Sequence, residues 1–341
     1  MSLQRIDIHH HIFPPEYLAA IDRLGLTEAG GGGVAFPDWS LSASLEMMDR
    51  HDIQTAIASI ASPGVYFRDA RLARELARRC NEYSASVVRE YPDRFGFFAS
   101  VPLPAISDAI AEAAYALDTL KCDGLVLMGS VADRFLGDPE FEEFMQELDR
   151  RKTVVFIHPN VHSSNRQLGL KFPAALFEFL ADTTRAVLNL ALSGALHRYP
   201  NIRSILSHAG GAIPSHAWRW ALADRSPIVK KNAPQGVLTY LRQLYFDTAL
   251  SPSPYAMRPA LDLAGSKHIL FGSDFPYVRG DVLNFEIEQF DQLEVFNEVI
   301  RSMVVRANAL ALFPRLAQKA AAARRERLRC RSYPLSSFFF A

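Results

Sequence analysis

Eight short apolar runs, each separated from the next by a longer segment, constrain the fold of this chain most strongly. The runs are nearly continuous in apolar and β-branched residues, which is typical of strands buried on both faces of a parallel sheet. Helical patterns occupy the intervening segments, for example residues 69–90 and 141–150. The predicted strands are residues 5–9, 55–60, 95–101, 124–128, 153–158, 202–208, 244–248 and 268–274.

Eight strand–helix units in 341 residues fit a closed (β/α)8 barrel better than an open doubly wound sheet. Two Rossmann-like halves are the alternative. A Gly-x-Gly-x-x-Gly motif after the first strand would favour that alternative, and the sequence has none there. We therefore predict an α/β protein with a distorted (β/α)8 TIM barrel over residues 1–314.

Three segments fall outside the repeat. Residues 28–38 contain four consecutive glycines, so we expect a long loop after the first strand, over the mouth of the barrel, although a disordered surface loop is equally compatible. Residues 160–173 are a second insertion, after the fifth strand. Residues 315–341 form a basic and aromatic extension, which could contact a partner or a membrane surface, but whose composition favours a solvated or subunit-packing tail.

Composition excludes several classes of protein. The 37 basic and 37 acidic residues balance, and 49% of residues are hydrophobic, which argues against a disordered chain and against a general attraction to nucleic acid or anionic lipid. The three cysteines are too few and too scattered for a disulfide framework. We find no signal peptide and no apolar run of about 18 residues, so we expect a cytoplasmic protein.

Polar side chains end four of the predicted strands. His9 and His11 share one face of the first strand because alternate residues of a strand point the same way. His158 ends the fifth strand, His208 the sixth and Asp274 the eighth. Any one of these histidines could be an ordinary core residue. Because the C-terminal ends of barrel strands converge on one mouth, five such residues together predict a metal site there.

These motifs resemble those of a known family. Asp-x-His-x-His at the start, Ile-His-Pro, Ser-His-Ala-Gly-Gly and Gly-Ser-Asp-Phe-Pro are similar to the motifs of the amidohydrolase superfamily. More narrowly, they resemble its metal-dependent nonoxidative decarboxylases, which act on aminocarboxymuconate semialdehyde, γ-resorcylate or 6-methylsalicylate. The resemblance extends from residue 6 to about residue 313 and is greatest to the 6-methylsalicylate enzymes, through the segments 36–41 and 59–64.

The resemblance implies that one divalent ion is held by His9, His11, His158 and Asp274. It implies zinc or manganese, and the pair of histidines on the first strand favours zinc, because γ-resorcylate decarboxylases carry a glutamate at the first position. His208 would lie beside the substrate. Met128 ends the fourth strand, where binuclear hydrolases of the superfamily carry a carboxylated lysine, so we expect a mononuclear site.

The resemblance also suggests substrate-binding residues. Arg219 matches an arginine that grips a substrate carboxylate in the muconate semialdehyde enzyme, where it can come from the neighbouring subunit; an ordinary solvated arginine is the alternative. The second substrate arginine of that enzyme has no counterpart here, which argues against a dicarboxylate. Trp39 and Phe36 would line an apolar pocket for a benzenoid ring, or could instead be packing within their own loop. The family also implies a homodimer.

The predicted reaction is nonoxidative decarboxylation of an aromatic acid such as a salicylate. The metal would orient the carboxylate and a neighbouring hydroxyl, and Asp274 would protonate the ring carbon with help from His208. Mononuclear hydrolysis of an amide, ester or lactone would use the same residues and stays an alternative. A non-enzymatic barrel with a structural ion is a third, although structural zinc sites close all four positions.

Overall fold

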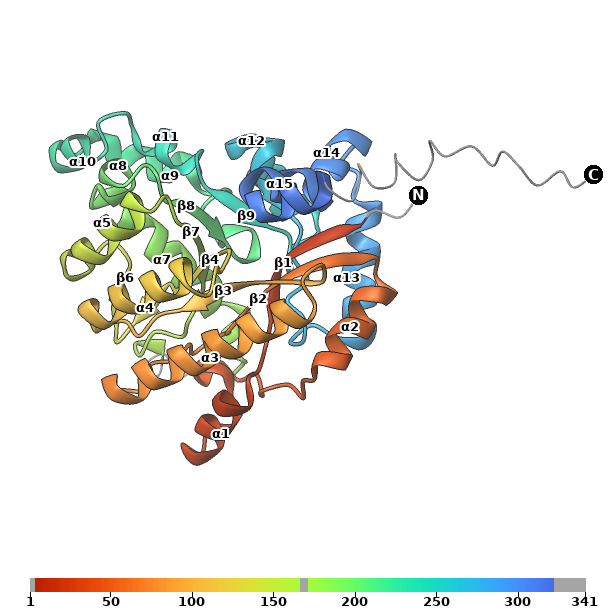
Figure 1. Cartoon of the computed structure of the whole chain (residues 1–341). Coiled ribbons are helices and arrows are strands. Elements are labelled where there is room, and N and C mark those ends of the chain that lie inside the picture. The colour runs from red at the N-terminus through yellow and green to blue at the C-terminus, as the bar shows by residue number, and fades with distance from the viewer. Residues whose placement is uncertain (1–3, 166–170, 322–341) are drawn as a thin grey trace, which may run out of the picture.

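The computed structural model describes residues 4–165 and 171–321. Its main sheet has eight strands, all pairs are parallel, and the strands follow one another in space in chain order (Figure 1). This order confirms the predicted (β/α)8 barrel and excludes two Rossmann-like halves, whose strand order would reverse. The strands are β1 (Arg5–His11), β2 (Ile53–Ser59), β3 (Phe95–Ser100), β4 (Gly124–Met128), β7 (Val154–His158), β8 (Arg203–Leu206), β9 (Tyr245–Asp247) and β10 (Ile269–Leu270).

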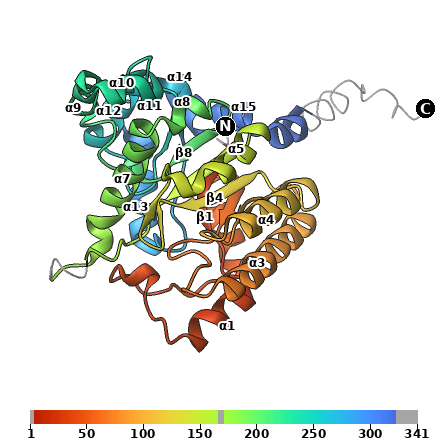
Figure 2. The ribbon, with the colours of Figure 1, turned by 90° about the vertical axis from the view of Figure 1, so that its left-hand side faces the viewer.

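Helices cover the outside of the sheet (Figure 2). The longest, α3, begins where the Asp69 carboxylate accepts a hydrogen bond from the Leu72 N–H at 3.0 Å, a standard N-cap. The helices are α1 (Pro15–Arg23), α2 (Leu41–Arg50), α3 (Ala70–Glu90), α4 (Ile106–Asp118), α5 (Glu142–Arg150), α7 (Glu178–Leu192), α8 (Ala195–Arg198), α9 (Ala217–Ala221), α10 (Pro227–Asn232), α11 (Val237–Leu241), α12 (Pro254–Ala264), α13 (Gly280–Gln292), α14 (Glu298–Ser302) and α15 (Asn308–Leu312). A small hairpin, β5 (Ser130–Val131) and β6 (Arg134–Phe135), follows β4.

The barrel closes between β1 and the segment that follows β10. The Ile8 N–H donates to the Phe271 carbonyl at 3.0 Å, and the Asp274 N–H donates to the His9 carbonyl at 2.8 Å. The buried carboxylate of Asp7 adds a side-chain link, because it accepts hydrogen bonds from the backbone N–H and the hydroxyl of Ser273 at 3.0 and 2.6 Å. These contacts place the end of β1 beside Asp274.

Several predicted strand bounds differ from the structure by a few residues, and two of these differences lie where the barrel closes. β1 continues to His11 rather than ending at His9, and regular pairing of the eighth strand ends at Leu270 rather than Asp274. The segment after Leu270 instead bonds irregularly to β1, and Asp274 adopts a left-handed backbone with φ +57°. The irregular backbone turns the Asp274 side chain toward the histidines of β1.

The first predicted insertion lies over the barrel mouth, as expected. Its regular features are one short 3-10 turn, Ala29–Gly31, and one antiparallel β-bridge between Glu28 and Ala35, and Ala29 and Val34 line a cavity above the strand ends. The second insertion is described in part, because residues 166–170 are outside the described residues.

The chain beyond the predicted barrel begins as a helix over residues 314–321. Arg315 there pairs with Asp123 at 2.8 Å, and Leu316 is buried in the core, so these residues pack on the barrel. The arginines of the predicted tail from residue 324 onward, and its phenylalanines, lie beyond the described residues. None of the described helices is both long and apolar enough to cross a membrane.

Candidate metal centre

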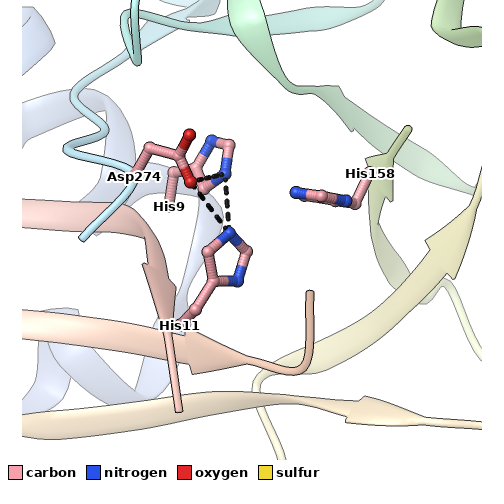
Figure 3. Close-up of side chains that lie close together, drawn as sticks. All are labelled: His9, His11, His158 and Asp274. Atoms are coloured by element: carbon pink, nitrogen blue, oxygen red, sulfur yellow. Dashed lines mark hydrogen bonds and ion pairs between the residues drawn. The ribbon is translucent and has the colours of Figure 1, made fainter. Parts of the chain in front are cut away.

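Three histidines and one aspartate meet where the barrel strands end (Figure 3). His9 and His11 come from one face of β1, His158 is the last residue of β7, and Asp274 follows β10. All four are buried, and one ligand atom from each lies within 4.8 Å of the others. His10 points to the other face of β1, where its Nε2 contacts the Ser44 hydroxyl at 3.0 Å. The structure therefore assembles the predicted ligand set.

The atoms of this cluster crowd one another as metal ligands do. The Nε2 atoms of His9 and His11 are 3.1 Å apart, and the Oδ1 atom of Asp274 lies 3.2 Å from the first and 3.0 Å from the second. Nε2 lone pairs and a carboxylate oxygen at this separation repel one another unless a cation or a proton lies between them. The cluster is therefore arranged to hold a positive charge, either a metal ion or a proton on His9.

The hydrogen bond made by the Nδ1 atom of each histidine determines whether its Nε2 atom is free to bind a metal. Every Nδ1 has an acceptor within reach, and a donating Nδ1–H leaves the lone pair on Nε2. The Nδ1 acceptors are Asp247 Oδ2 for His9 at 2.6 Å, the Ser59 carbonyl for His11 at 3.3 Å and the Pro159 carbonyl for His158 at 2.9 Å. In the two β1 histidines, the freed Nε2 atoms are those that face Asp274.

Electrostatics give the cluster the charges that a divalent ion needs. Burial alone would lower the pKa of His9, but the carboxylates of Asp274 and Asp247 outweigh it and raise that pKa to about 10. Burial lowers the pKa of both His11 and His158, which keeps them neutral. Burial would raise the pKa of Asp274, but the surrounding histidines hold it well below its ordinary value. This set fits a single divalent ion, with His11 and His158 neutral, Asp274 ionised, and His9 neutral once it has released its proton to the solvent on metal binding.

His208 lies beside this cluster. Its Nε2 is 3.4 Å from the Oδ2 atom of Asp274, and its ring stacks on Phe179 with centroids 6.4 Å apart. His208 and Ala209 both have left-handed backbones, with φ of +51° and +54°. Such strain in residues other than glycine is concentrated at functional sites, where the surrounding structure enforces it. The strained turn after β8 thus presents the imidazole to Asp274.

A cavity of about 510 Å³ opens above the cluster. His158, His208, Asp274 and Tyr277 contribute its charged or titratable atoms, and the described residues that line it include no lysine or arginine. Most of the wall is apolar. Apolar lining residues include Ala29, Val34, Leu176, Phe179, Leu180 and Val278. An apolar cavity over a few convergent polar groups is the usual form of a small-molecule site.

The amidohydrolase family profile matches residues 6–315, which is most of the chain and all of the barrel. The chain belongs to the amidohydrolase family. This membership agrees with the resemblance that the four sequence motifs suggested.

Relatives of this amidohydrolase include named decarboxylases. A 6-methylsalicylic acid decarboxylase of Penicillium expansum is 34% identical over 92% of this chain and 97% of its own length. A solved amidohydrolase II structure is 28% identical and superposes with a TM-score of 0.84 over 90% of this chain and 99% of its own. A dihydroxybenzoic acid decarboxylase from Polaromonas, solved with bound manganese and 2-nitroresorcinol, is 22% identical, with a TM-score of 0.77 over 91% of this chain and 96% of its own.

Met128 of this amidohydrolase occupies the end of β4, directly opposite His158 in the β4–β7 pairing. Its side chain is buried and offers only a weak thioether acceptor. Within the described residues, His9, His11, His158 and Asp274 are the one group with metal-ligand geometry. The described part of the site therefore fits one metal ion rather than two.

The three predicted substrate-binding residues lie away from the cavity wall. Arg219 is exposed on α9, and among the described residues its guanidinium has no hydrogen bond or ion pair. The Trp39 indole donates to the Ser44 hydroxyl at 2.9 Å, and Phe36 packs edge-on against Phe13. None of the three is among the described residues that line the cavity. Their role in substrate binding stays a prediction.

Sequence reasoning missed two residues of the site. Asp247 is the last residue of β9, and its carboxylate contacts the Nδ1 atom of His9. The sequence could have indicated Asp247, because it follows an apolar run as Asp274 does. Tyr277 lines the cavity three residues after Asp274, and its hydroxyl has no partner among the described residues. Burial raises the pKa of this phenol, so it stays protonated. Nothing in the sequence pattern distinguishes Tyr277 from an ordinary loop tyrosine.

Proposed function

We propose that this protein is a metal-dependent, nonoxidative decarboxylase of an aromatic monocarboxylic acid of the 6-methylsalicylate type. The observation that carries the proposal is a single-metal ligand set at the floor of an apolar cavity of about 510 Å³. Because no lysine or arginine lines the described part of that cavity, a second carboxylate would be buried without a permanently charged partner, at a large desolvation cost. The similarity to the Penicillium expansum enzyme supports the same substrate class.

His9, His11, His158 and Asp274 would hold the metal. When bound, the ion supplies Lewis-acid chemistry and a fixed point for the substrate carboxylate. The apolar wall excludes water and orients the ring above Asp274 and His208.

Asp274 and His208 would transfer the proton that replaces the carboxyl group on the ring. Asp274 is ionised at neutral pH because its pKa is held low, so it needs a proton donor before it can protonate carbon. His208, 3.4 Å from Asp274 Oδ2, is placed to supply that proton. The carboxyl group of Asp274 then protonates the ring carbon that bears the substrate carboxylate. The C–C bond breaks, its electron pair returns to the ring, and CO2 leaves without an oxidant.

We propose zinc as the ion. Three neutral imidazoles and one carboxylate suit zinc, whereas manganese prefers sites richer in oxygen. Manganese is the ion bound to the Polaromonas enzyme, so the two metals are the ones to compare. Metal analysis of the purified protein, followed by kcat with each ion restored, distinguishes them.

We also propose that the protein is a cytoplasmic homodimer. On the helical segment after β8, Trp218 and Leu222 leave 76% and 53% of their surface exposed, as residues of subunit interfaces do before assembly. The cysteines within the described residues, Cys80 and Cys122, are free thiols, which suits a reducing compartment. Light scattering of the purified protein measures the subunit number directly.

The proposal is tested with metal-loaded protein and two substrate panels, one of hydroxybenzoates and one of aryl esters and lactones. We expect 6-methylsalicylate to release CO2 and an equimolar amount of 3-methylphenol. Turnover of lactones or esters without any CO2 release from the hydroxybenzoates would instead establish mononuclear hydrolysis.

A further inference from the structure

The hydroxyl of Tyr277 is a buried polar atom with no hydrogen-bond partner among the described residues. Three lining residues of the cavity have such an atom: Asp274, His208 and Tyr277. The Oδ1 atom of Asp274 faces the metal ligands, and His208 belongs to the proposed proton path. The Tyr277 hydroxyl therefore has no role in the metal centre that explains why it is left unpaired.

The Tyr277 ring is held firmly in place. It packs edge-on against the His11 ring, with centroids 5.6 Å apart, and against Phe13, at 6.0 Å. The backbone behind it is fixed as well, because the Val278 N–H donates to the Asp274 carbonyl at 3.0 Å. The phenol is therefore fixed relative to two of the proposed metal ligands, Asp274 and His11.

A buried hydroxyl without a partner costs free energy, and native structures rarely leave one unless a ligand or water completes it. A protonated phenol offers one donor to such a partner. Most described residues that line the cavity are apolar, and the polar ones, which include Ser62, Ser251 and His158, make no hydrogen bond to this hydroxyl. Since no described residue supplies the missing acceptor, a ligand in the cavity is the candidate for it.

We propose that Tyr277 is a substrate-binding residue whose hydroxyl donates a hydrogen bond to an oxygen of the aromatic acid in the cavity. The inference rests on the proposed function for the identity of that acid. The contact would make the site selective for ligands that carry an oxygen near the end of the molecule that bears the carboxylate. Without such an oxygen, the tyrosine hydroxyl would stay unpaired. Ring substituents away from that end would meet only the apolar wall.

The test is Tyr277→Phe, which keeps the ring contacts and removes the hydroxyl. We expect KM for 6-methylsalicylate to rise roughly ten- to a hundredfold, the usual effect of a lost hydrogen bond to a charged or polar ligand, with kcat changed less than about threefold. Metal content should stay the same. Tm should be unchanged or higher, because the variant removes an unpaired buried group.

Tyr17→Phe is the matched control. Tyr17 is also a buried tyrosine, but its hydroxyl already donates to the Gly64 carbonyl at 3.0 Å and it does not line the cavity. We expect this variant to lower Tm and to leave KM unchanged. A Tyr277→Phe enzyme with the wild-type KM, or with the loss of Tm seen in Tyr17→Phe, would overturn the inference.

Calorimetric binding of 6-methylsalicylate separates this inference from the proposed function. If the wild-type protein binds the acid but does not decarboxylate it, the proposed reaction is wrong. In that case a weaker dissociation constant in Tyr277→Phe still supports the tyrosine contact, and an unchanged one overturns it. If the wild-type protein does not bind the acid, both proposals are wrong.

Discussion

The chemistry of single side chains is set by partners that are not metal ligands themselves. His9 shows this most clearly, because the Asp247 carboxylate at 2.6 Å fixes the ring orientation, keeps the proton on Nδ1 and makes Nε2 a better donor to a metal. Both side chains are fully buried, so solvent weakens their interaction little. Asp247 is therefore part of the metal centre even though it would not touch the ion.

We expect Asp247→Asn to weaken metal affinity about ten- to a hundredfold, the usual effect of losing a carboxylate behind a ligating histidine. Competition with a fluorescent chelator measures this. Asp224→Asn is a suitable control, because the Asp224 carboxylate also accepts a backbone N–H, from Val237 at 2.9 Å, but lies outside the metal centre. Equal metal affinity in the two variants would contradict the assigned role.

Metal uptake should release about one proton per site at neutral pH. His9, with its pKa raised to about 10, carries a proton before the metal binds, whereas His11, His158 and Asp274 have none to lose. Because the proton competes with the metal, affinity should fall about tenfold for each unit that pH drops between 8 and 6. Calorimetry in buffers of different ionisation enthalpy counts the proton, and a pH-independent affinity would contradict this prediction.

His208→Asn should lower kcat by about two to four orders of magnitude, the range expected when a general acid–base group is lost. It should leave metal content unchanged, since His208 is outside the ligand set. His216→Asn is the matched control, because His216 is exposed and contacts Ser215 rather than the cluster. Steady-state kinetics with parallel metal analysis tests the prediction, which fails if His208→Asn loses its metal or keeps its full rate.

At the scale of elements, the site depends on how β1 closes against the chain after β10. Gly272 lies at this closure, and a methyl group added there would come 2.8 Å from the Cβ atom of His9 and 3.4 Å from that of Asp247. The absence of a side chain at Gly272 therefore lets β1, β9 and the segment before Asp274 approach one another. Asp7 reinforces the same closure through Ser273.

Gly272→Ala should destabilise the protein by about 1–3 kcal/mol through overpacking. It should also weaken metal binding, because the methyl group pushes directly on His9. Urea unfolding of the metal-free variant measures the first effect, and chelator competition measures the second. Wild-type stability and affinity in the variant would mean that the closure has more space than the structure indicates.

At the scale of the whole molecule, the barrel does not depend on the metal for its core. One continuous cluster of buried apolar residues includes side chains from β1 through the helix after Phe313, within the described residues. A core of this size can remain folded when a surface or cavity ligand is removed. We therefore expect the barrel to fold without the metal ion.

Removal of the ion by a chelator should abolish turnover while far-UV circular dichroism stays unchanged. Tm should fall by several degrees, because an ion that binds only the folded state stabilises it by about 2.7 kcal/mol at a concentration one hundred times its Kd. Restoring zinc or manganese should recover both Tm and activity. Complete unfolding on chelation would instead mean that the ion is structural.

The sequence by itself determined the barrel and which residues gather at its rim as candidate metal ligands. Near-continuous apolar runs predict strands that are covered on both faces. A polar residue at the C-terminal end of such a strand is expected to lie at the rim of the sheet that all the strands share. For that reason His9, His11, His158 and Asp274 could be named, and the structure brings them together.

Only the tertiary structure decided what surrounds that rim. The contact between His9 and Asp247 joins residues 238 positions apart, and the hydroxyl of Tyr277 is exceptional because none of the described residues forms a hydrogen bond with it. Trp39 and Phe36 contact Ser44 and Phe13, which the sequence did not indicate, and their predicted role in substrate binding stays a prediction. Strand order follows from local patterns, whereas the contents of a cavity depend on loops whose paths are fixed by long-range packing.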